Sequence, residues 1–105
     1  MNIEKLKSLL GNDEKLVWKF LHVFKNETPH QLEKLQRAIE QRDWENISII
    51  AHGIKSQAKY LDLRKIAALA ADIEQCGEEK DDLEGLPIYF YELDEKLQEV
   101  ITGMD

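Results

Sequence analysis

Cysteine is almost absent from this chain of 105 residues, in which Cys76 is the sole example. A single thiol excludes a disulfide within the chain and is typical of the reducing cytoplasm, where we expect this protein to be found. The sequence also lacks a run of about 18 apolar residues, the length of a membrane-spanning helix, and we expect no secretory signal at its start. The ligand spacings Cys-x-x-Cys and His-Glu-x-x-His are missing, so we expect no metal site.

Basic residues are fewer than acidic ones in this chain. Lysine and arginine number 14 against 21 aspartates and glutamates, which leaves a formal net charge of −7. Such a surface repels the phosphates of nucleic acids and of anionic membranes, and we expect neither as a partner. A glycine-rich phosphate loop is missing as well, so we expect no autonomous kinase activity.

Alternating apolar and polar residues, the pattern of a half-buried strand, do not occur, and no segment is repeated or of low complexity. The apolar residues recur instead at intervals of three and four, which predicts helices. Residues 1–105 are expected to form one all-α domain, an antiparallel four-helix bundle with a short additional N-terminal helix. The bundle is expected to span residues 28–102, with helices at 29–39, 44–61, 63–77 and 88–101, plus the helix before them at 16–24; the short additional helix is expected at 3–10.

Capping residues indicate where some of these helices begin. Thr28, Pro29 and Gln31 predict a helix start, because threonine caps, proline suits the first helical position and glutamine completes a capping box. Asp43 is expected to cap the helix that begins at the next residue, and Asp62 the helix after it. The short connection before residue 44 predicts that the helices on either side of it are antiparallel neighbours.

The helix expected near residues 46–61 carries a histidine on its polar side. Its apolar residues form a stripe about 100° wide, because successive residues turn by roughly 100° around a helix. His52 lies about 150° from the centre of that stripe, so its imidazole is predicted to face solvent. A histidine that belonged to the core would lie on the stripe. The stripe consists of Ile47, Ile50, Ala51, Ile54, Ala58 and Leu61.

Two polar side chains accompany His52. Lys55 follows it by three residues and Ser56 by four, so both neighbour the imidazole on a helix surface. Imidazole is nucleophilic near neutral pH, and a phosphoryl group on it would gain charge compensation from Lys55 and a hydrogen bond from Ser56. The spacing by itself is equally compatible with an ordinary polar helix face that happens to include a histidine.

A wider pattern surrounds these residues. The segment Ala-His-Gly-Ile-Lys-Ser at 51–56 resembles the Ala-His-x-Leu-Lys-Gly segment of histidine phosphotransfer (HPt) domains, the phosphate carriers of two-component phosphorelays. The sequence departs from that family at Ser56 and Asp62, where glycine is usual. The remaining resemblance, in the order of the family's helices, lies in residues 20–24, 32–35, 38–39, 43–45 and 67–74.

The resemblance implies a function. It implies that His52 accepts a phosphoryl group from an aspartate of a response-regulator receiver domain and passes it to another receiver. It also implies that the chain binds no cofactor itself, because the receiver would supply Mg²⁺ and most of the transition-state stabilisation. The expected partners are receiver domains, with that of a hybrid sensor kinase as one candidate, and the chain is expected to be a monomer.

A receiver also needs surface to dock on. Ile49 and Tyr60 fall outside the apolar stripe, on the side of the histidine, and unburied apolar residues around a polar centre suggest an interface. Burial of both beneath the first or second helix is an equally open alternative. Lys59 and Ser48 complete the expected docking residues.

Four further polar side chains are candidates for the site: two glutamines and two histidines. Gln57, and Gln75 from the antiparallel neighbour helix, are expected to approach it as supporting residues. His22 lies in an apolar helix, where a histidine is more often a packing or surface residue than a functional one. His30 lies in the first turn of a helix, where the dipole disfavours a cation. Both of these histidines are interpreted as bystanders.

A second class of function fits the same sequence, namely a helical adaptor that binds proteins without carrying phosphate. The acidic surface and Ser56 in place of glycine suit that function, and such an adaptor would tolerate the loss of both His52 and Lys55. A hydrolase with His52 as general base is disfavoured, because neither a nucleophile nor an orienting carboxylate stands at a convincing spacing.

Overall fold

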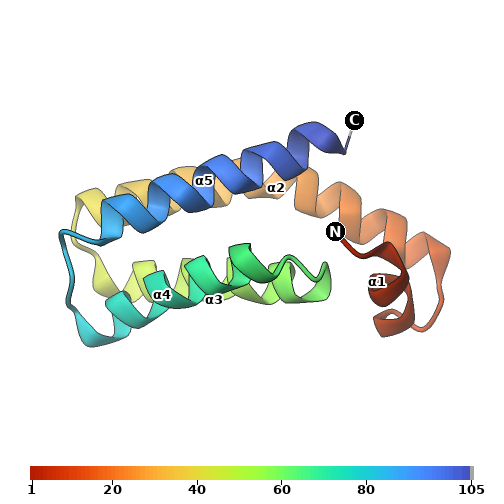
Figure 1. Ribbon diagram of the computed structural model, residues 1–105, viewed down its shortest axis with the longest axis horizontal. Coiled ribbons are helices and arrows are strands. Elements are labelled where there is room, and N and C mark those ends of the chain that lie inside the picture. Colours follow the sequence, from red (N-terminus) through yellow and green to blue (C-terminus); the bar gives the residue numbers. More distant parts are fainter. Residues whose placement is uncertain (105) are drawn as a thin grey trace.

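The computed structural model describes residues 1–104, and in that range every regular element is an α-helix. Four long helices form an antiparallel bundle, and a short one lies against one end of it (Figure 1). The prediction of an all-α four-helix bundle with a short additional N-terminal helix is confirmed. The helices are α1 (Ile3–Leu9), α2 (Glu14–Glu40), α3 (Trp44–Tyr60), α4 (Arg64–Glu79) and α5 (Leu86–Gly103).

Helix α2 is longer than the sequence predicted. Its 27 residues form one helix where two were expected, at 16–24 and 29–39, and the predicted helix start at Thr28 and Pro29 is wrong. Thr28 is fully buried within the helix, and Pro29 lies inside it. Proline removes one backbone hydrogen bond, but both flanks share a continuous buried seam whose packing stabilises the helix across it. The seam consists of Val17, Phe24, Thr28, Leu32, Leu35 and Ala38.

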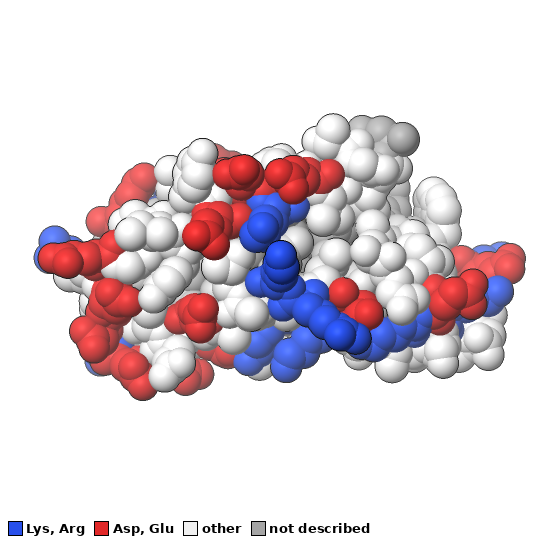
Figure 2. Space-filling model, viewed as in Figure 1, with Lys and Arg blue, Asp and Glu red and all other residues white. Residues whose placement is uncertain are grey.

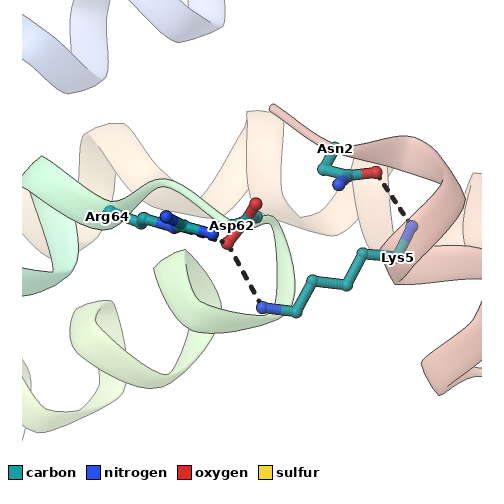
Figure 3. A network of polar contacts seen from close by, with 4 residues as sticks. All are labelled: Asn2, Lys5, Asp62 and Arg64. Carbon is teal, nitrogen blue, oxygen red and sulfur yellow. Dashed lines mark hydrogen bonds and ion pairs between the residues drawn. The ribbon is translucent and has the colours of Figure 1, made fainter.

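Helix α1 packs on the part of α2 that extends beyond the rest of the bundle (Figure 1). Leu6 of α1 is fully buried there. Two polar contacts attach α1 to the turn between α3 and α4. The backbone N–H of Asn2 donates to the carbonyl of Leu61 at 2.9 Å, and Lys5 Nζ lies 3.3 Å from Asp62 Oδ1 (Figure 3). Helix α1 thus closes one end of the bundle.

The turn between α3 and α4 corrects a second prediction. Asp62 does not cap α4, because the N-cap residue is Leu63 and no side chain caps this helix. Asp62 adopts a φ of 57°, a left-handed conformation that aspartate tolerates better than most residues, and its carboxylate binds Arg64 and Lys5 (Figure 3). Hydrogen bonds from Arg64 and then Lys5 hold the pKa of Asp62 below its usual value. Asp43 caps α3 as predicted, accepting a backbone N–H of the first turn at 3.3 Å.

Helices α3 and α4 make direct backbone contact at Gly77. A Cβ atom at this position would lie 2.8 Å from the backbone nitrogen of Ser48 and 2.9 Å from the carbonyl oxygen of Trp44. Carbon atoms do not approach nitrogen or oxygen so closely in packed proteins, so only glycine allows this separation of the two helices. The close approach brings side chains on their outer edges within hydrogen-bond reach of each other.

Apolar side chains from all five helices fill the core between them. The largest fully buried ones include Leu6, Leu35, Ile47, Ile73 and Leu93. Within residues 1–104, no helix combines the length and the apolar character required to cross a lipid bilayer.

Candidate functional site

His52 lies near the middle of α3, on the side that faces solvent. Ile47, Ala51, Ile54 and Ala58 of the same helix are buried, and this turns the intervening polar positions outward. The His52 side chain keeps 61% of its surface exposed. Its imidazole is therefore accessible to a molecule that approaches α3 from outside the bundle.

A carboxylate from the neighbouring helix holds the imidazole in place. Glu74 extends from α4, and its Oε2 lies 2.6 Å from His52 Nδ1. The other oxygen, Oε1, accepts a hydrogen bond from Lys55 Nζ. Both oxygens of Glu74 are thus occupied by residues of α3 that lie one turn apart. The three side chains form a single polar cluster that joins α3 to α4.

Glu74 is ionised despite its burial. Only 9% of the residue is exposed, and burial raises the pKa of a carboxyl because it removes water from the charged form. The hydrogen bonds from Lys55 and His52 outweigh that effect and hold the pKa of Glu74 below its usual value. At neutral pH the group is a carboxylate and can only accept hydrogen bonds.

The acceptor character of Glu74 determines which nitrogen of His52 is protonated. Because a carboxylate cannot donate, the hydrogen bond at 2.6 Å requires the proton to lie on His52 Nδ1. The neutral imidazole then carries its lone pair on Nε2, on the other side of the ring from Glu74. The contact therefore presents Nε2 as the nucleophilic atom.

The predicted supporting residues occupy different sides of α3. The ammonium of Lys55 contacts Glu74 rather than the imidazole, and 20% of the Lys55 side chain is exposed. Ser56 is half-buried one turn after His52. Gln57 lies on the side of α2, where it lines a shallow groove with apolar residues of that helix.

The expected approach of Gln75 does not occur. Its side chain is exposed and donates a hydrogen bond to Glu79 at 3.1 Å, one turn further along α4. The site receives Glu74 from this helix instead. Adjacent residues of a helix point about 100° apart, so these two side chains cannot share one face.

Two flanks of different character border the imidazole. Towards α2, Ile49 and Tyr60 are 60% and 44% exposed, so neither is buried beneath α1 or α2. The Tyr60 ring lies 5.6 Å from that of Phe20, measured between centroids. Towards α4, Lys59 is exposed and Ser48 is half-buried, each within about 40° of the histidine around the helix axis.

The remaining histidines and the thiol lie elsewhere. His22 stacks on Trp18 with 5.0 Å between ring centroids and contacts Asn26 at 3.1 Å, while His30 is exposed on α2. Cys76 is 8% exposed, and burial, followed by the negative charge of nearby aspartates, raises the pKa of its thiol. Among residues 1–104, no three His, Cys, Asp or Glu side chains are grouped so that they could hold a metal ion.

Sequence reasoning did not single out Glu74, although a signal was present. The buried positions of α4 include Ile66, Ala70, Ile73 and Gly77, and residue 74 falls among them, four residues after Ala70. A charged side chain on an apolar stripe is buried only when it is paired. Its position therefore indicated a partner on the facing helix.

Comparisons with known proteins extend these observations. A sequence model of a family described as the Hpt domain matches residues 19–103, a range that includes His52, Lys55 and Glu74. Among solved structures, the HPT domain of an Hpt sensor hybrid histidine kinase from Shewanella is similar in fold, with a TM-score of 0.82 and 20% sequence identity. That similarity covers 98% of this chain and 88% of the other. No curated protein shows a significant match to the sequence.

Proposed function

Because this chain belongs to the Hpt domain family, we propose that it works as a phosphorelay intermediate. In this proposal His52 accepts a phosphoryl group from the aspartyl phosphate of one receiver domain and passes it to an aspartate of another. The observation that carries the proposal is the 2.6 Å contact between Glu74 Oε2 and His52 Nδ1. It supports the proposal because it keeps the proton on Nδ1 and leaves the lone pair of Nε2 free to attack, on a side chain that is 61% exposed.

The transfer exchanges one bond for another. The lone pair of His52 Nε2 attacks the phosphorus of the acyl phosphate, the bond from phosphorus to the aspartate oxygen breaks, and the aspartate leaves as a carboxylate with that electron pair. The imidazole becomes positively charged as the new bond forms, because Nδ1 keeps its proton. Glu74 stabilises this charge without taking the proton. Transfer to the second receiver is the same step in reverse.

Other groups have supporting roles in this proposal. The ammonium of Lys55 uses one donor on Glu74 and has others for phosphoryl oxygens, and Ser56 offers a hydroxyl. The receiver supplies Mg²⁺ and most of the transition-state stabilisation, so the chain needs no cofactor and does not phosphorylate itself from ATP. We place the exchange in the cytoplasm, with a monomeric chain and with receiver domains as partners, that of a hybrid sensor kinase among the candidates.

The test of this function is transfer from a receiver. Receiver domains that carry a radiolabelled aspartyl phosphate are mixed with the chain in the presence of Mg²⁺, and the label on the chain is followed over time. Label that survives base and is lost in acid identifies phosphohistidine. Receivers that bind without transferring label would favour the phosphate-free adaptor instead.

Ile49→Asp is expected to weaken receiver binding about tenfold and to leave the fold intact. Ile49 is 60% exposed, so the new charge stays in water until a partner covers it, and only then does its burial cost free energy. The dissociation constant is measured by calorimetry, and Tm, measured by circular dichroism, should change by less than about 3 °C.

Ile88→Asp is the matched control for this variant. Ile88 is 62% exposed on α5, and α5 makes no contact with α3, so receiver affinity should stay at the wild-type value. An unchanged affinity of the Ile49→Asp variant together with a large fall in its Tm would contradict the docking role of Ile49.

Glu74→Gln is expected to slow phosphoryl acceptance about tenfold, the effect of losing a group that orients a functional imidazole. Glutamine has the same shape, but its amide both donates and accepts, so it no longer requires the proton to lie on His52 Nδ1. Nitrogen-15 NMR of the imidazole should show one tautomer in the wild type and a mixture in the variant. Glu78→Gln, which removes an exposed carboxylate from the same helix, is the control. A wild-type rate with an unchanged tautomer in the Glu74 variant would show that this contact does not position the ring.

A further inference from the structure

Basic side chains gather along one border of the site. Figure 2 shows Lys and Arg in a continuous band across the middle of one face, over the region where α3 turns into α4, while most Asp and Glu in that view lie away from it. The polar residues that line a shallow pocket at this turn are Lys5, Lys59, Asp62 and Arg64. We call the following residues the basic band: Lys5, Lys55, Lys59, Arg64 and Lys65.

The basic band is positive on a chain that is strongly negative. Its five cations are accompanied by two carboxylates, Asp62 and Glu74, which leaves a net charge of +3. The whole chain carries −7, so the residues outside this region carry −10. An approaching protein therefore meets opposite signs of charge on the two parts of the surface.

The charge of the basic band is not neutralised within the molecule. Lys59 and Lys65 are exposed, and in the part of the chain that the structure describes neither lies within ion-pair distance of a carboxylate. Arg64 binds Asp62, yet 88% of its side chain is exposed. These three cations are available to a partner without breaking the contacts that hold the fold.

Local helix stability does not explain this arrangement. The first turn of α4 contains Arg64 and Lys65, no acidic residue and no capping side chain. Cations at a helix N-terminus are unfavourable, because the helix dipole is positive there. Helices α1, α2 and α3 all begin with a capping Asn or Asp and a glutamate in the first turn. The two cations at the start of α4 thus strengthen the positive field of the basic band, although they lower the stability of the helix's first turn.

The basic band reaches the nucleophile. Lys55 and Lys59 follow His52 by three and seven residues on α3, and Lys59 lies about 10 Å from it along the helix axis. The Debye length is about 8 Å at physiological ionic strength, so Lys55, about 4.5 Å from His52 along the axis, lies within it, and Lys59 lies slightly beyond it, where salt screens more strongly. The field of the band therefore acts on any group that approaches His52.

We propose that the basic band docks an acidic surface of the receiver, next to its phosphorylated aspartate, and that it selects among receivers by charge. This inference rests on the proposed function. The apolar flank with Ile49 and Tyr60 lies on the side of His52 towards α2, whereas the basic band lies on the side towards α4. A fitting receiver presents apolar side chains on one side of its phosphorylation pocket and acidic side chains on the other, which determines its orientation. Charge complementarity of this kind acts mainly on the rate of association.

The experiment compares two double variants with the same change in net charge. Lys59→Glu with Lys65→Glu reverses the basic band, while Lys34→Glu with Lys80→Glu reverses two exposed lysines outside it. A receiver that phosphorylates the wild-type chain is used in rapid-quench measurements at 50 and 500 mM NaCl. The second-order rate constant at low concentration and the first-order rate at saturation are determined for each protein.

Reversal of the basic band is expected to lower the second-order rate constant about tenfold at low salt and less than about threefold at high salt, because salt screens surface charge. The first-order rate at saturation should stay within about twofold of the wild type, and the control should lose less than about threefold throughout. Equal losses in both variants, or a loss that salt does not reduce, would overturn this proposal and leave the phosphorelay function intact. A wild-type chain that accepts phosphate from no receiver would overturn both.

Discussion

A His52→Gln variant is expected to acquire no label from any phosphorylated receiver. An amide nitrogen has its lone pair delocalised into the carbonyl, so glutamine offers no nucleophile at this position. The side chain is 61% exposed in the wild type, and the glutamine amide still has N–H groups for Glu74. The variant should therefore stay folded, with a Tm within about 3 °C of the wild type, and should still bind the receiver. Label transfer, thermal melting and calorimetry measure the three properties separately.

His30→Gln provides the matched control for that experiment. His30 is exposed on α2, whereas His52 and Glu74 belong to α3 and α4, so its replacement should leave transfer at the wild-type rate. Label on the His52→Gln variant at the wild-type rate would refute His52 as the acceptor. Binding that survives while transfer is lost would also separate the phosphorelay from the adaptor, since an adaptor has no transfer to lose.

Gly77→Ala is expected to destabilise the protein by about 2 to 3 kcal/mol, which lowers Tm by roughly 10 to 20 °C. The added Cβ would lie 2.8 Å and 2.9 Å from backbone atoms of α3, and backbone cannot yield as a flexible side chain can. Helices α3 and α4 must then separate. Because Glu74 and His52 meet across this interface, separation should also disorder the imidazole, which the NMR tautomer measurement detects.

Gly53→Ala is the control, since Gly53 also lies inside a helix of this pair. Its added Cβ meets nothing closer than the Gln31 side-chain nitrogen at 3.9 Å. Alanine is a better helix former than glycine, so this variant should be stabilised by up to about 1 kcal/mol. A Gly77→Ala variant as stable as the Gly53→Ala variant would mean that the helices are not held together at Gly77.

Helix periodicity was enough to predict the orientation of α3. The intervals between Ile47, Ala51, Ile54 and Ala58 depend only on the geometry of the helix, and these residues are all buried while His52 is exposed. The cap at Asp43 was predictable for the same reason, because a side chain and the N–H three residues later interact within one turn.

Predictions failed where a local signal competed with contacts between distant residues. Thr28 and Pro29 favour a helix start locally, but the core contacts of α2 on both sides of them favour one continuous helix. Asp62 could have capped α4, but Lys5 lies 57 positions earlier in the chain and binds the carboxylate in the folded protein. Neither competing partner is visible in a window of a few residues.

The sequence by itself determined the helical architecture, the outward position of His52 and the resemblance to a phosphotransfer family, because each depends on periodicity or on order along the chain. Only the tertiary structure decided that Glu74, 22 residues after His52, would bind its Nδ1 and so present Nε2. Likewise, only the packing of α1 against the turn between α3 and α4 brings Lys5 beside Lys59 and Arg64 at one border of the site. The physical reason is that hydrogen bonds and surface charge act through space, and the spacing of residues in a chain does not report the distance between two helices.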